Sequence, residues 1–277
     1  MSTREKRSRI AKETLQILDR GYYINESGDK VVISAELSSA VENTELYGPE
    51  ELKELRVRSE SPVPPSIDIN NETTLRAARR LAGEDDLSPF VLNFASAKNP
   101  GGGFLRGSGA QEESLARKSG LYACIEPVKE YYERNRATGT GLYTDHMIYS
   151  PRVPVFRDRR DKLLDRPYYV SILTAPAVNR GAVKRNEPEK LSKVRDTMDW
   201  RIGKVLRLAE LKGHDYLVLG AWGCGVFGND PREIASLFEE NLLREPNANW
   251  GFERVVFAVL DRSAERETLQ IFREVLG

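Results

Sequence analysis

Cysteine and histidine are scarce in this sequence of 277 residues, which contains two of each. Cys124 and Cys224 are too few for a disulfide framework and are typical of a reducing compartment, so we expect a cytoplasmic protein. His146 and His214 belong to no C-x-x-C or H-E-x-x-H pattern, and the sequence contains no acidic calcium loop. We therefore expect a protein that needs neither a metal ion nor another cofactor.

An excess of charge of either sign is also missing, because 42 basic residues balance 42 acidic residues. A neutral chain lacks the bulk attraction for nucleic acid or for an anionic membrane, so we expect direct binding of neither. No apolar stretch approaches the roughly 20 residues that cross a bilayer, and residues 1–15 lack the apolar core of a secretory signal. Any anion that this protein binds must be held locally.

The hydrophobic pattern changes near residue 66. Before it, residues 3–20 predict a helix with a solvated basic face that stops at Gly21, and the proline-rich stretch 61–66 breaks regular structure. After it, buried-type strands alternate with helices, which predicts an α/β layered fold with an accessory segment over 1–66 and a core domain over 67–277. The expected strands are 90–95, 145–149, 168–174, 216–219 and 255–259, and the expected helices are 73–81, 114–132 with an interruption near Pro127, 187–212, 231–243 and 265–276.

Two glycine-rich loops each follow a buried-type strand, one over 95–109 and one over 220–231. Ligands of α/β sheets bind at the carboxyl ends of strands, so two such loops predict one shared pocket. Glycines let backbone N–H groups approach an anion directly, which fits phosphate binding without lysine. The loops match neither a P-loop nor a dinucleotide fingerprint, because Asn229 follows the last glycine of the second loop and Arg106 replaces a required glycine in the first. The alternative is that both loops are merely tight turns.

A pair of carboxylates, Glu112 and Glu113, lies in the first turn of the helix after the first glycine loop. Acidic residues are favoured there by the helix dipole, so the pair has a simple structural explanation. A carboxylic acid in that place can also protonate the departing oxygen of a glycosidic bond. The dipole lowers a carboxyl pKa, whereas a general acid benefits from a raised one, so burial or mutual repulsion of the two glutamates has to dominate.

The run Gly101–Gly102–Gly103 followed by Gln111–Glu112–Glu113 resembles the GGG-x6-8-QEE signature of poly(ADP-ribose) glycohydrolases, a catalytic branch of the macrodomain fold. The stretch from residue 93 to residue 122 is similar to the compact microbial type, and GVFGNDP at 225–231 is similar to the phosphate loop of macrodomains. The resemblance covers roughly residues 67–277 and implies a three-layer α/β/α macrodomain-like mixed sheet.

The resemblance also implies roles for individual residues. Glu113 is expected to be the general acid that protonates the leaving ribose oxygen and then activates water, while Glu112 holds the ribose hydroxyls. A thiol nucleophile at Cys224 is disfavoured, because this cysteine lies inside the phosphate loop. Gln111 is expected to fix the ribose and the neighbouring glutamate, and Asn99 can bind a ribose hydroxyl, although an asparagine before proline is equally a turn former. The other expected substrate-binding residues are Gly101, Gly102, Gly103, Gly223, Cys224, Gly225 and Val226 around the diphosphate, and Phe227 on the distal ribose, where the alternative is a core plug.

The function implied by this resemblance is hydrolysis of the ribose–ribose O-glycosidic bonds of poly(ADP-ribose), with release of ADP-ribose. The expected substrates are the free polymer or ADP-ribosylated proteins, which places the chain in ADP-ribosylation reversal and in the DNA damage response, as a monomer. Two alternatives stay open at this point. One is a macrodomain that binds ADP-ribose without cutting it, and the other is a hydrolase of a related ADP-ribosyl linkage.

Overall fold

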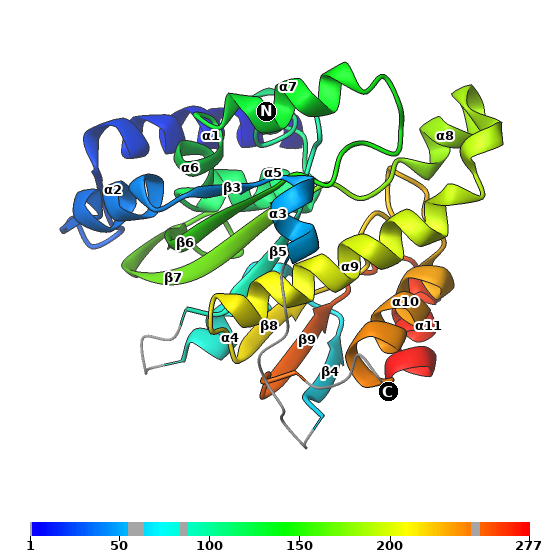
Figure 1. The fold of residues 1–277 in the computed structure, drawn as a ribbon. Helices are drawn as coiled ribbons and strands as arrows, with labels where there is room; N and C mark the ends of the chain where they lie inside the picture. The colour runs from blue at the N-terminus through cyan, green and yellow to red at the C-terminus, as the bar shows by residue number, and fades with distance from the viewer. Residues whose placement is uncertain (1, 55–63, 84–87, 245–249) are drawn as a thin grey trace.

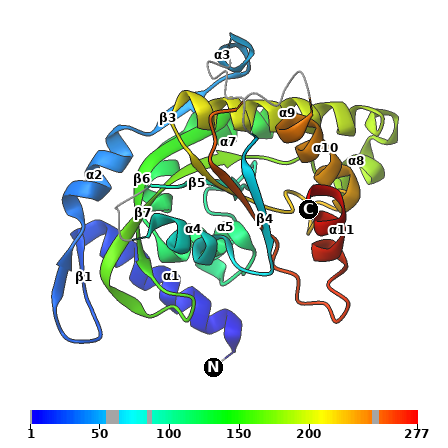
Figure 2. The same ribbon diagram turned by 90° about the horizontal axis from the view of Figure 1, so that it is seen from below.

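A seven-stranded mixed sheet forms the centre of the computed structural model, which describes residues 2–54, 64–83, 88–244 and 250–277 (Figure 1). A separate two-stranded hairpin projects beside it (Figure 2). The sheet has the order β3 (Glu45–Tyr47), β6 (Met147–Arg157), β7 (Leu163–Ala175), β5 (Phe90–Phe94), β8 (Tyr216–Leu219), β9 (Arg254–Ala258) and β4 (Ser66–Asn70), and the hairpin consists of β1 (Tyr22–Ile24) and β2 (Lys30–Val32).

Most of the sheet is parallel, from β7 through β5, β8 and β9 to β4, while β6 is antiparallel to both of its neighbours, β7 and β3. Parallel strands covered on both faces are mostly apolar, as in β5, whose residues 90–93 are all buried and include one polar side chain, Asn93. The carboxyl ends of the parallel strands lie at one edge of the sheet. The two glycine loops follow β5 and β8, which are hydrogen-bonded neighbours, so the fold brings them together at that edge.

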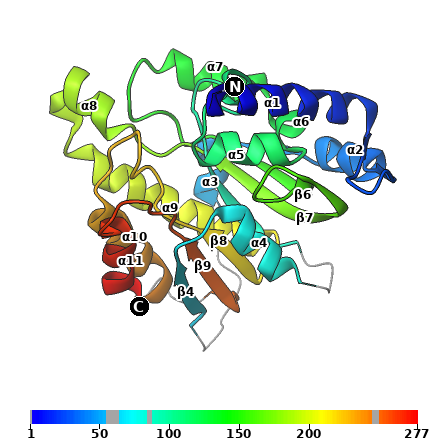
Figure 3. The same cartoon turned by 180° about the vertical axis from the view of Figure 1, so that it is seen from behind.

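Helices cover both faces of the sheet and complete three layers, as the sequence predicted (Figures 1 and 3). The longest, α9, buries an apolar stripe that includes Met198, Ile202 and Val205 against one face. That face carries α3 (Pro49–Glu54), α8 (Arg180–Asn186), α9 (Lys193–Leu211), α10 (Pro231–Leu243) and α11 (Glu267–Leu276), and the opposite face carries α2 (Ser34–Glu42), α4 (Thr74–Ala82), α5 (Gln111–Lys118), α6 (Leu121–Ile125) and α7 (Lys129–Ala137).

The helix predicted over 3–20 is α1 (Thr3–Arg20), which lies outside the second helical layer (Figure 3). Ser2 and Glu5 form a capping box at its start, and Gly21 ends it with a left-handed φ of 72°. Residues 45–47 of the expected accessory segment form β3, an edge strand of the main sheet. Residues 61–63 of the predicted break lie outside the described residues, and the division at residue 66 stays a prediction.

The structure departs from the predicted elements in three places, and three helices, α2, α3 and α8, were not predicted. The region 114–132 contains three helices instead of one, separated at 119–120 and near Pro127. The long helix begins at Lys193 instead of 187, because a 3-10 turn that starts at Pro188 follows α8. Strand β6 continues past Pro151 and Pro154 because shifts in its register with β7 accommodate the proline-containing segment.

Candidate active site

One cavity of about 1360 Å³ opens at the carboxyl edge of the sheet, and residues of both glycine loops line it. This confirms that the loops share a pocket. The predicted site residues Asn99, Gln111, Glu112, Glu113, Gly223, Cys224, Gly225, Val226 and Phe227 all contribute to its wall. Gly101, Gly102 and Gly103 are not among the lining residues, because they lie behind Glu113.

The triple glycine makes room for the two carboxylates. Gly102 has a left-handed φ of 58°, and a Cβ there would lie 2.6 Å from Oε1 of Glu113 and 3.0 Å from Oε2 of Glu112. The backbone N–H of Gly103 donates a 3.0 Å hydrogen bond to Oε1 of Glu113. The close approach that requires glycine is therefore an approach of the backbone to these side chains. The expected contact of the three glycines with a diphosphate stays a prediction.

Glu112 is buried beneath the loop, with 4% of its surface exposed. Its Oε2 accepts a 2.7 Å hydrogen bond from the backbone N–H of Ser96, and its Oε1 accepts a 3.4 Å bond from Nδ2 of Asn93. Burial raises the pKa of Glu112 to about 8, the negative charge of nearby Glu113 acts in the same direction, and the hydrogen bond from Ser96 opposes them. Burial therefore dominates over the helix dipole at this carboxyl group, which is mostly protonated at neutral pH.

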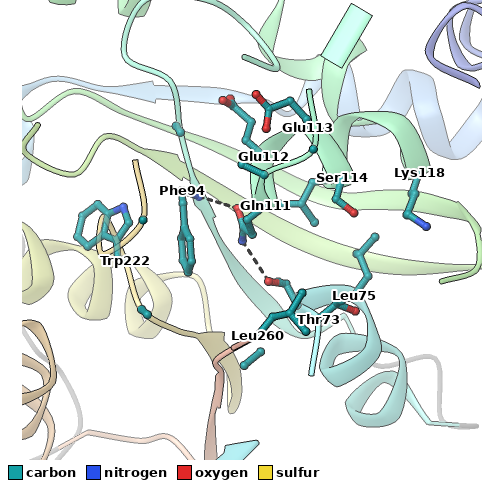
Figure 4. A pocket seen from close by; sticks show the side chains of 18 of the residues that line it. Thr73, Leu75, Phe94, Gln111, Glu112, Glu113, Ser114, Lys118, Trp222 and Leu260 are labelled. Carbon is teal, nitrogen blue, oxygen red and sulfur yellow. Dashed lines mark hydrogen bonds between the residues drawn. The ribbon is translucent and has the colours of Figure 1, made fainter. Parts of the chain in front are cut away.

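Glu113 lies next to Glu112 with its two oxygens in different surroundings (Figure 4). Oε1 is held by the N–H of Gly103, as described above. Oε2 is shielded from solvent and has no hydrogen-bond partner among the described residues. An unpartnered buried carboxyl oxygen is costly, and it is well suited to exchange a proton with a bound group.

Gln111 connects three elements of the scaffold (Figure 4). Its Oε1 accepts a 2.9 Å hydrogen bond from the backbone N–H of Phe94. Its Nε2 donates to the carbonyl of Leu92 at 2.8 Å and to Oγ1 of Thr74 at 3.2 Å. These bonds fix the start of α5 against β5 and α4, so Gln111 orients the helix that carries both glutamates. Its expected ribose contact stays a prediction.

The second loop presents backbone N–H groups to the cavity. Within the described parts of the chain, the N–H groups of Gly225, Val226 and Phe227 have no hydrogen-bond acceptor. Val226 is 93% exposed at the tip of the loop, so its side chain contributes little packing. Three unpaired N–H groups in succession form a concavity suited to an anion. Burial of the thiol raises the pKa of Cys224 to about 12, so a thiolate nucleophile is disfavoured at this position.

Asn229 supports this loop from behind and was not singled out from the sequence. Its Nδ2 donates to the carbonyl of Val178 at 2.8 Å and to that of Gly223 at 3.2 Å. Gly223 has a left-handed φ of 77°, and a Cβ there would lie 2.3 Å from the same Nδ2. Only a glycine at position 223 lets the Asn229 side chain reach both carbonyls. The pairing of Gly223 with Asn229 in the loop motif was therefore the sequence signal for this support.

Tyr143 is a further wall residue that sequence patterns did not indicate. Its φ of 60° is unusual for a non-glycine residue, and its ring lies 6.1 Å from that of Phe227. The buried Arg201 donates from Nη2 to the carbonyls of Leu142 and Tyr143 and from Nε to Asp145 at 2.7 Å. The contact with Arg201, almost sixty residues away along the chain, leaves no local sequence signal.

The described residues contain no group of three potential metal ligands among His, Cys, Asp and Glu. In the same parts of the chain, no helix is long and apolar enough to cross a membrane. The site that the geometry does define has two adjacent carboxyl groups beside a row of unpaired N–H groups, which suits the cleavage of a glycosidic bond in an anionic substrate.

Comparison with known proteins identifies the family. The model of the microbial-type PARG catalytic domain, where PARG stands for poly(ADP-ribose) glycohydrolase, matches residues 11–158. The poly(ADP-ribose) glycohydrolase of Thermomonospora curvata is 45% identical, with a TM-score of 0.92 over 99% of this chain and 100% of that chain. The chain belongs to the microbial-type poly(ADP-ribose) glycohydrolase family. The resemblance predicted from the glycine and QEE motifs is thereby confirmed.

Two liganded structures of this family are also similar to the chain. The T. curvata glycohydrolase bound to the inhibitor ADP-HPD is 45% identical, with a TM-score of 0.90 over 98% of this chain and 99% of that chain. A Deinococcus radiodurans glycohydrolase in complex with ADP-ribose is 46% identical, with a TM-score of 0.82 over 87% of this chain and 96% of that chain. No functionally curated protein matches the sequence significantly. The predicted macrodomain-like fold and the glycosidase activity toward poly(ADP-ribose) are confirmed.

Proposed function

We propose that Glu113 is the general acid and base with which this glycohydrolase cuts the ribose–ribose bond. The observation that carries this assignment is the pair of unlike oxygens on Glu113, with Oε1 held by Gly103 and Oε2 unpartnered. In its protonated form, Glu113 gives its proton to the leaving ribose oxygen as the glycosidic C–O bond breaks. The resulting carboxylate then takes a proton from the water that adds to the anomeric carbon, so the acid is regenerated.

Glu112 has a positioning role in this proposal. Its raised pKa keeps it protonated near neutral pH, so it can donate a hydrogen bond to a ribose hydroxyl as well as accept one from Ser96. Asn99 and Phe227, which line the cavity, contact the two riboses. The unpaired N–H groups of residues 225–227 hold the diphosphate together with the rest of the loop from Gly223. The ADP-ribose and ADP-HPD in the related structures support a ligand of this shape.

The finer biological setting is part of the same proposal. Two unpaired cysteines support a cytoplasmic location, and the balance of 42 basic and 42 acidic residues supports a protein that binds no nucleic acid directly. We infer a monomer that acts on the polymer or on ADP-ribosylated proteins and serves the DNA damage response by reversing ADP-ribosylation.

Turnover of purified polymer tests the catalytic assignment. Wild type releases ADP-ribose, and Glu113→Gln loses about 10²- to 10⁴-fold in kcat, the usual contribution of general acid and base catalysis. Glu130→Gln, which changes an exposed glutamate of α7 in the same way, serves as the matched control and keeps full activity. Equal rates for wild type and Glu113→Gln would remove Glu113 from the reaction. ADP-ribose binding without any cleavage by wild type would instead favour a reader of ADP-ribose.

A further inference from the structure

The cavity extends beyond the site described above into a second arm between α4 and α5. Its volume of about 1360 Å³ is larger than the roughly 300 to 1,000 Å³ of ordinary ligand pockets. Ser114 and Lys118, which are one helical turn apart on α5, carry its wall away from the two glutamates (Figure 4).

Basic side chains dominate the wall of this arm. We define the cationic arm by Arg7, Arg79, Arg117, Lys118, Arg157 and Arg159, which line the cavity together with the carboxylates Glu72, Asp158 and Asp161. Lys118 pairs with Asp161 at 2.8 Å, so the arginines supply most of the unpaired positive charge. Arg76 and Arg80 lie at its rim and share one carboxylate, Glu72, at 3.6 Å and 2.7 Å. In a chain with zero net charge, such an accumulation of one sign in one groove indicates an anionic ligand.

Several of these cations are buried, and their hydrogen-bonding capacity is only partly used. Arg117 is 4% exposed, donates from Nη1 to the carbonyl of Ser108 at 2.6 Å, and has no partner for Nε among the described residues. Arg157 is equally buried and likewise has an Nε without a partner in the described chain, although Glu13 and the carbonyl of Asp161 contact its other nitrogens. Buried guanidinium groups with unused donors are costly unless a ligand pairs with them.

The helix dipole explains only part of this arrangement. Arg79, Arg117 and Lys118 lie in the last turns of α4 and α5, where cations are favoured in any protein. Arg157 and Arg159 belong instead to the end of β6 and the following turn. Arg7 reaches in from α1 and lies so close to the backbone that a Cβ at Gly109 would be 2.2 Å from its Nη1. Three separate elements thus contribute cations to one groove without a dipole to favour them.

We propose that the cationic arm binds the pyrophosphate groups of a second ADP-ribose unit of the polymer, linked to the unit in the active site. The proposal rests on the proposed function, in which the first arm holds the unit that is cut. Each repeat of the polymer carries a pyrophosphate, and arginine forks match phosphate oxygens in pairs. The arm therefore selects polymer over monomeric ADP-ribose and leaves the chemistry at Glu113 unchanged.

Two exposed cations of the arm allow a test that does not disturb the core. Arg79 and Arg159 are exposed, so Arg79→Glu/Arg159→Glu reverses charge in the arm without emptying a buried site. The matched control is Lys193→Glu/Arg273→Glu, which changes the net charge equally at exposed positions that do not line the cavity. Both double variants are made in the Glu113→Gln background, so that binding is measured without turnover.

Fluorescence anisotropy with long polymer and with monomeric ADP-ribose gives the decisive comparison. We expect the arm variant to bind long polymer about tenfold more weakly, the order expected for two lost charge–phosphate contacts, and to bind ADP-ribose as before. The slope of the logarithm of its polymer-binding constant against the logarithm of salt concentration should become less steep by about 1.4, since each phosphate contact contributes roughly 0.7 in single-stranded nucleic acids. The control should bind both ligands like the parent protein.

Three results would overturn the proposal. The first is unchanged polymer affinity in the arm variant, and the second is an equal loss for polymer and for ADP-ribose. The third is single-stranded DNA that binds as tightly as the polymer and loses affinity in the same variant, which would make the arm a nucleic-acid site. Polymer turnover by wild type is measured separately, so a failure of the proposed reaction remains distinguishable from a failure of the arm.

Discussion

Replacing Gly102 with alanine separates two explanations of the triple glycine. Gly102 has φ of 58°, and the new Cβ would be placed 2.6 Å from Oε1 of Glu113. Carbon and oxygen atoms that are not bonded stay well over 3 Å apart, so the glutamate or the loop must shift by something approaching 1 Å. If the glycine exists to admit the carboxylates, the substitution damages catalysis. If it exists to admit a diphosphate, the substitution damages binding.

The expected magnitudes follow from this geometry. A left-handed backbone at a residue with a side chain costs about 1 to 2 kcal/mol of stability. Misplacing a catalytic group by about 1 Å can lower the rate roughly 10²-fold, which corresponds to about 2.7 kcal/mol of barrier. Gly213→Ala is the matched control, because Gly213 has φ of 71° and a Cβ there would meet nothing within 4 Å. Both variants lose stability through the left-handed backbone conformation, and only Gly102→Ala also displaces Glu113.

Three measurements on the same protein samples decide between the explanations. Thermal unfolding should give similar losses of Tm for both variants, at about 2 to 4 °C per kcal/mol for a chain of this size. Polymer turnover should fall about 10²-fold in kcat for Gly102→Ala alone. Calorimetric affinity for ADP-ribose should change little in either variant. A Gly102→Ala enzyme with kcat within threefold of wild type, or with weakened binding and preserved kcat, would refute the reasoning.

Three further predictions follow from single contacts. The pKa of Glu112 is raised from an ordinary 4.5 to about 8 in the folded state, so its contribution to stability is present below pH 4.5 and is lost as the pH rises to 8. In urea unfolding at several pH values, Glu112→Gln should show a smaller loss of stability over this range than wild type. Equal pH dependence of the two proteins would contradict this prediction. Arg201→Leu should lower the free energy of unfolding by about 3 kcal/mol, because Asp145 and three backbone carbonyls lose a buried hydrogen-bond donor. An unchanged midpoint of urea unfolding would contradict this stabilising role of Arg201. Val226→Pro removes one unpaired N–H and should weaken ADP-ribose binding about tenfold by calorimetry, whereas Val226→Ala should leave the affinity unchanged. Equal losses of affinity in both variants would assign the binding contribution to the side chain instead of the N–H group.

Long periodic elements could be predicted from the sequence because their signals are local. The helix over 231–243 has the predicted bounds, since Asp230 caps it and Pro231 opens it. Short elements were missed for the converse reason. Strand β3 has three residues, and only its pairing with β6 makes it a strand. Strand β4 is likewise defined by its ladder with β9, almost two hundred residues away along the chain.

The candidate site could be assembled from motifs, but the purpose of each residue could not. The motif predicts glycines that admit phosphate, which stays untested, and does not reveal that Gly102 also makes room for the two glutamate side chains that follow it. Gln111 is expected to fix both a ribose and the neighbouring glutamate; its amide binds the scaffold at both ends, which the motif does not reveal, and the ribose contact stays a prediction. A motif gives residue types and spacing, and these do not reveal which of two close neighbours a glycine or an amide serves. Tyr143 left no signal at all, because its contact with a buried arginine on α9 joins residues far apart along the chain.

Two adjacent glutamates in one helical turn would ordinarily behave alike, and the fold makes them differ. Glu112 turns inward, where burial raises its pKa against both the helix dipole and a hydrogen bond from Ser96. Glu113 turns toward the glycine loop, where Gly103 engages one oxygen and leaves the other unpartnered. In the function proposed above, a neutral Glu112 donates a hydrogen bond to a sugar hydroxyl and Glu113 transfers the proton. The different surroundings of these identical side chains are thus set by which way each leaves the first turn of α5, and the glycine loop makes the second direction sterically possible.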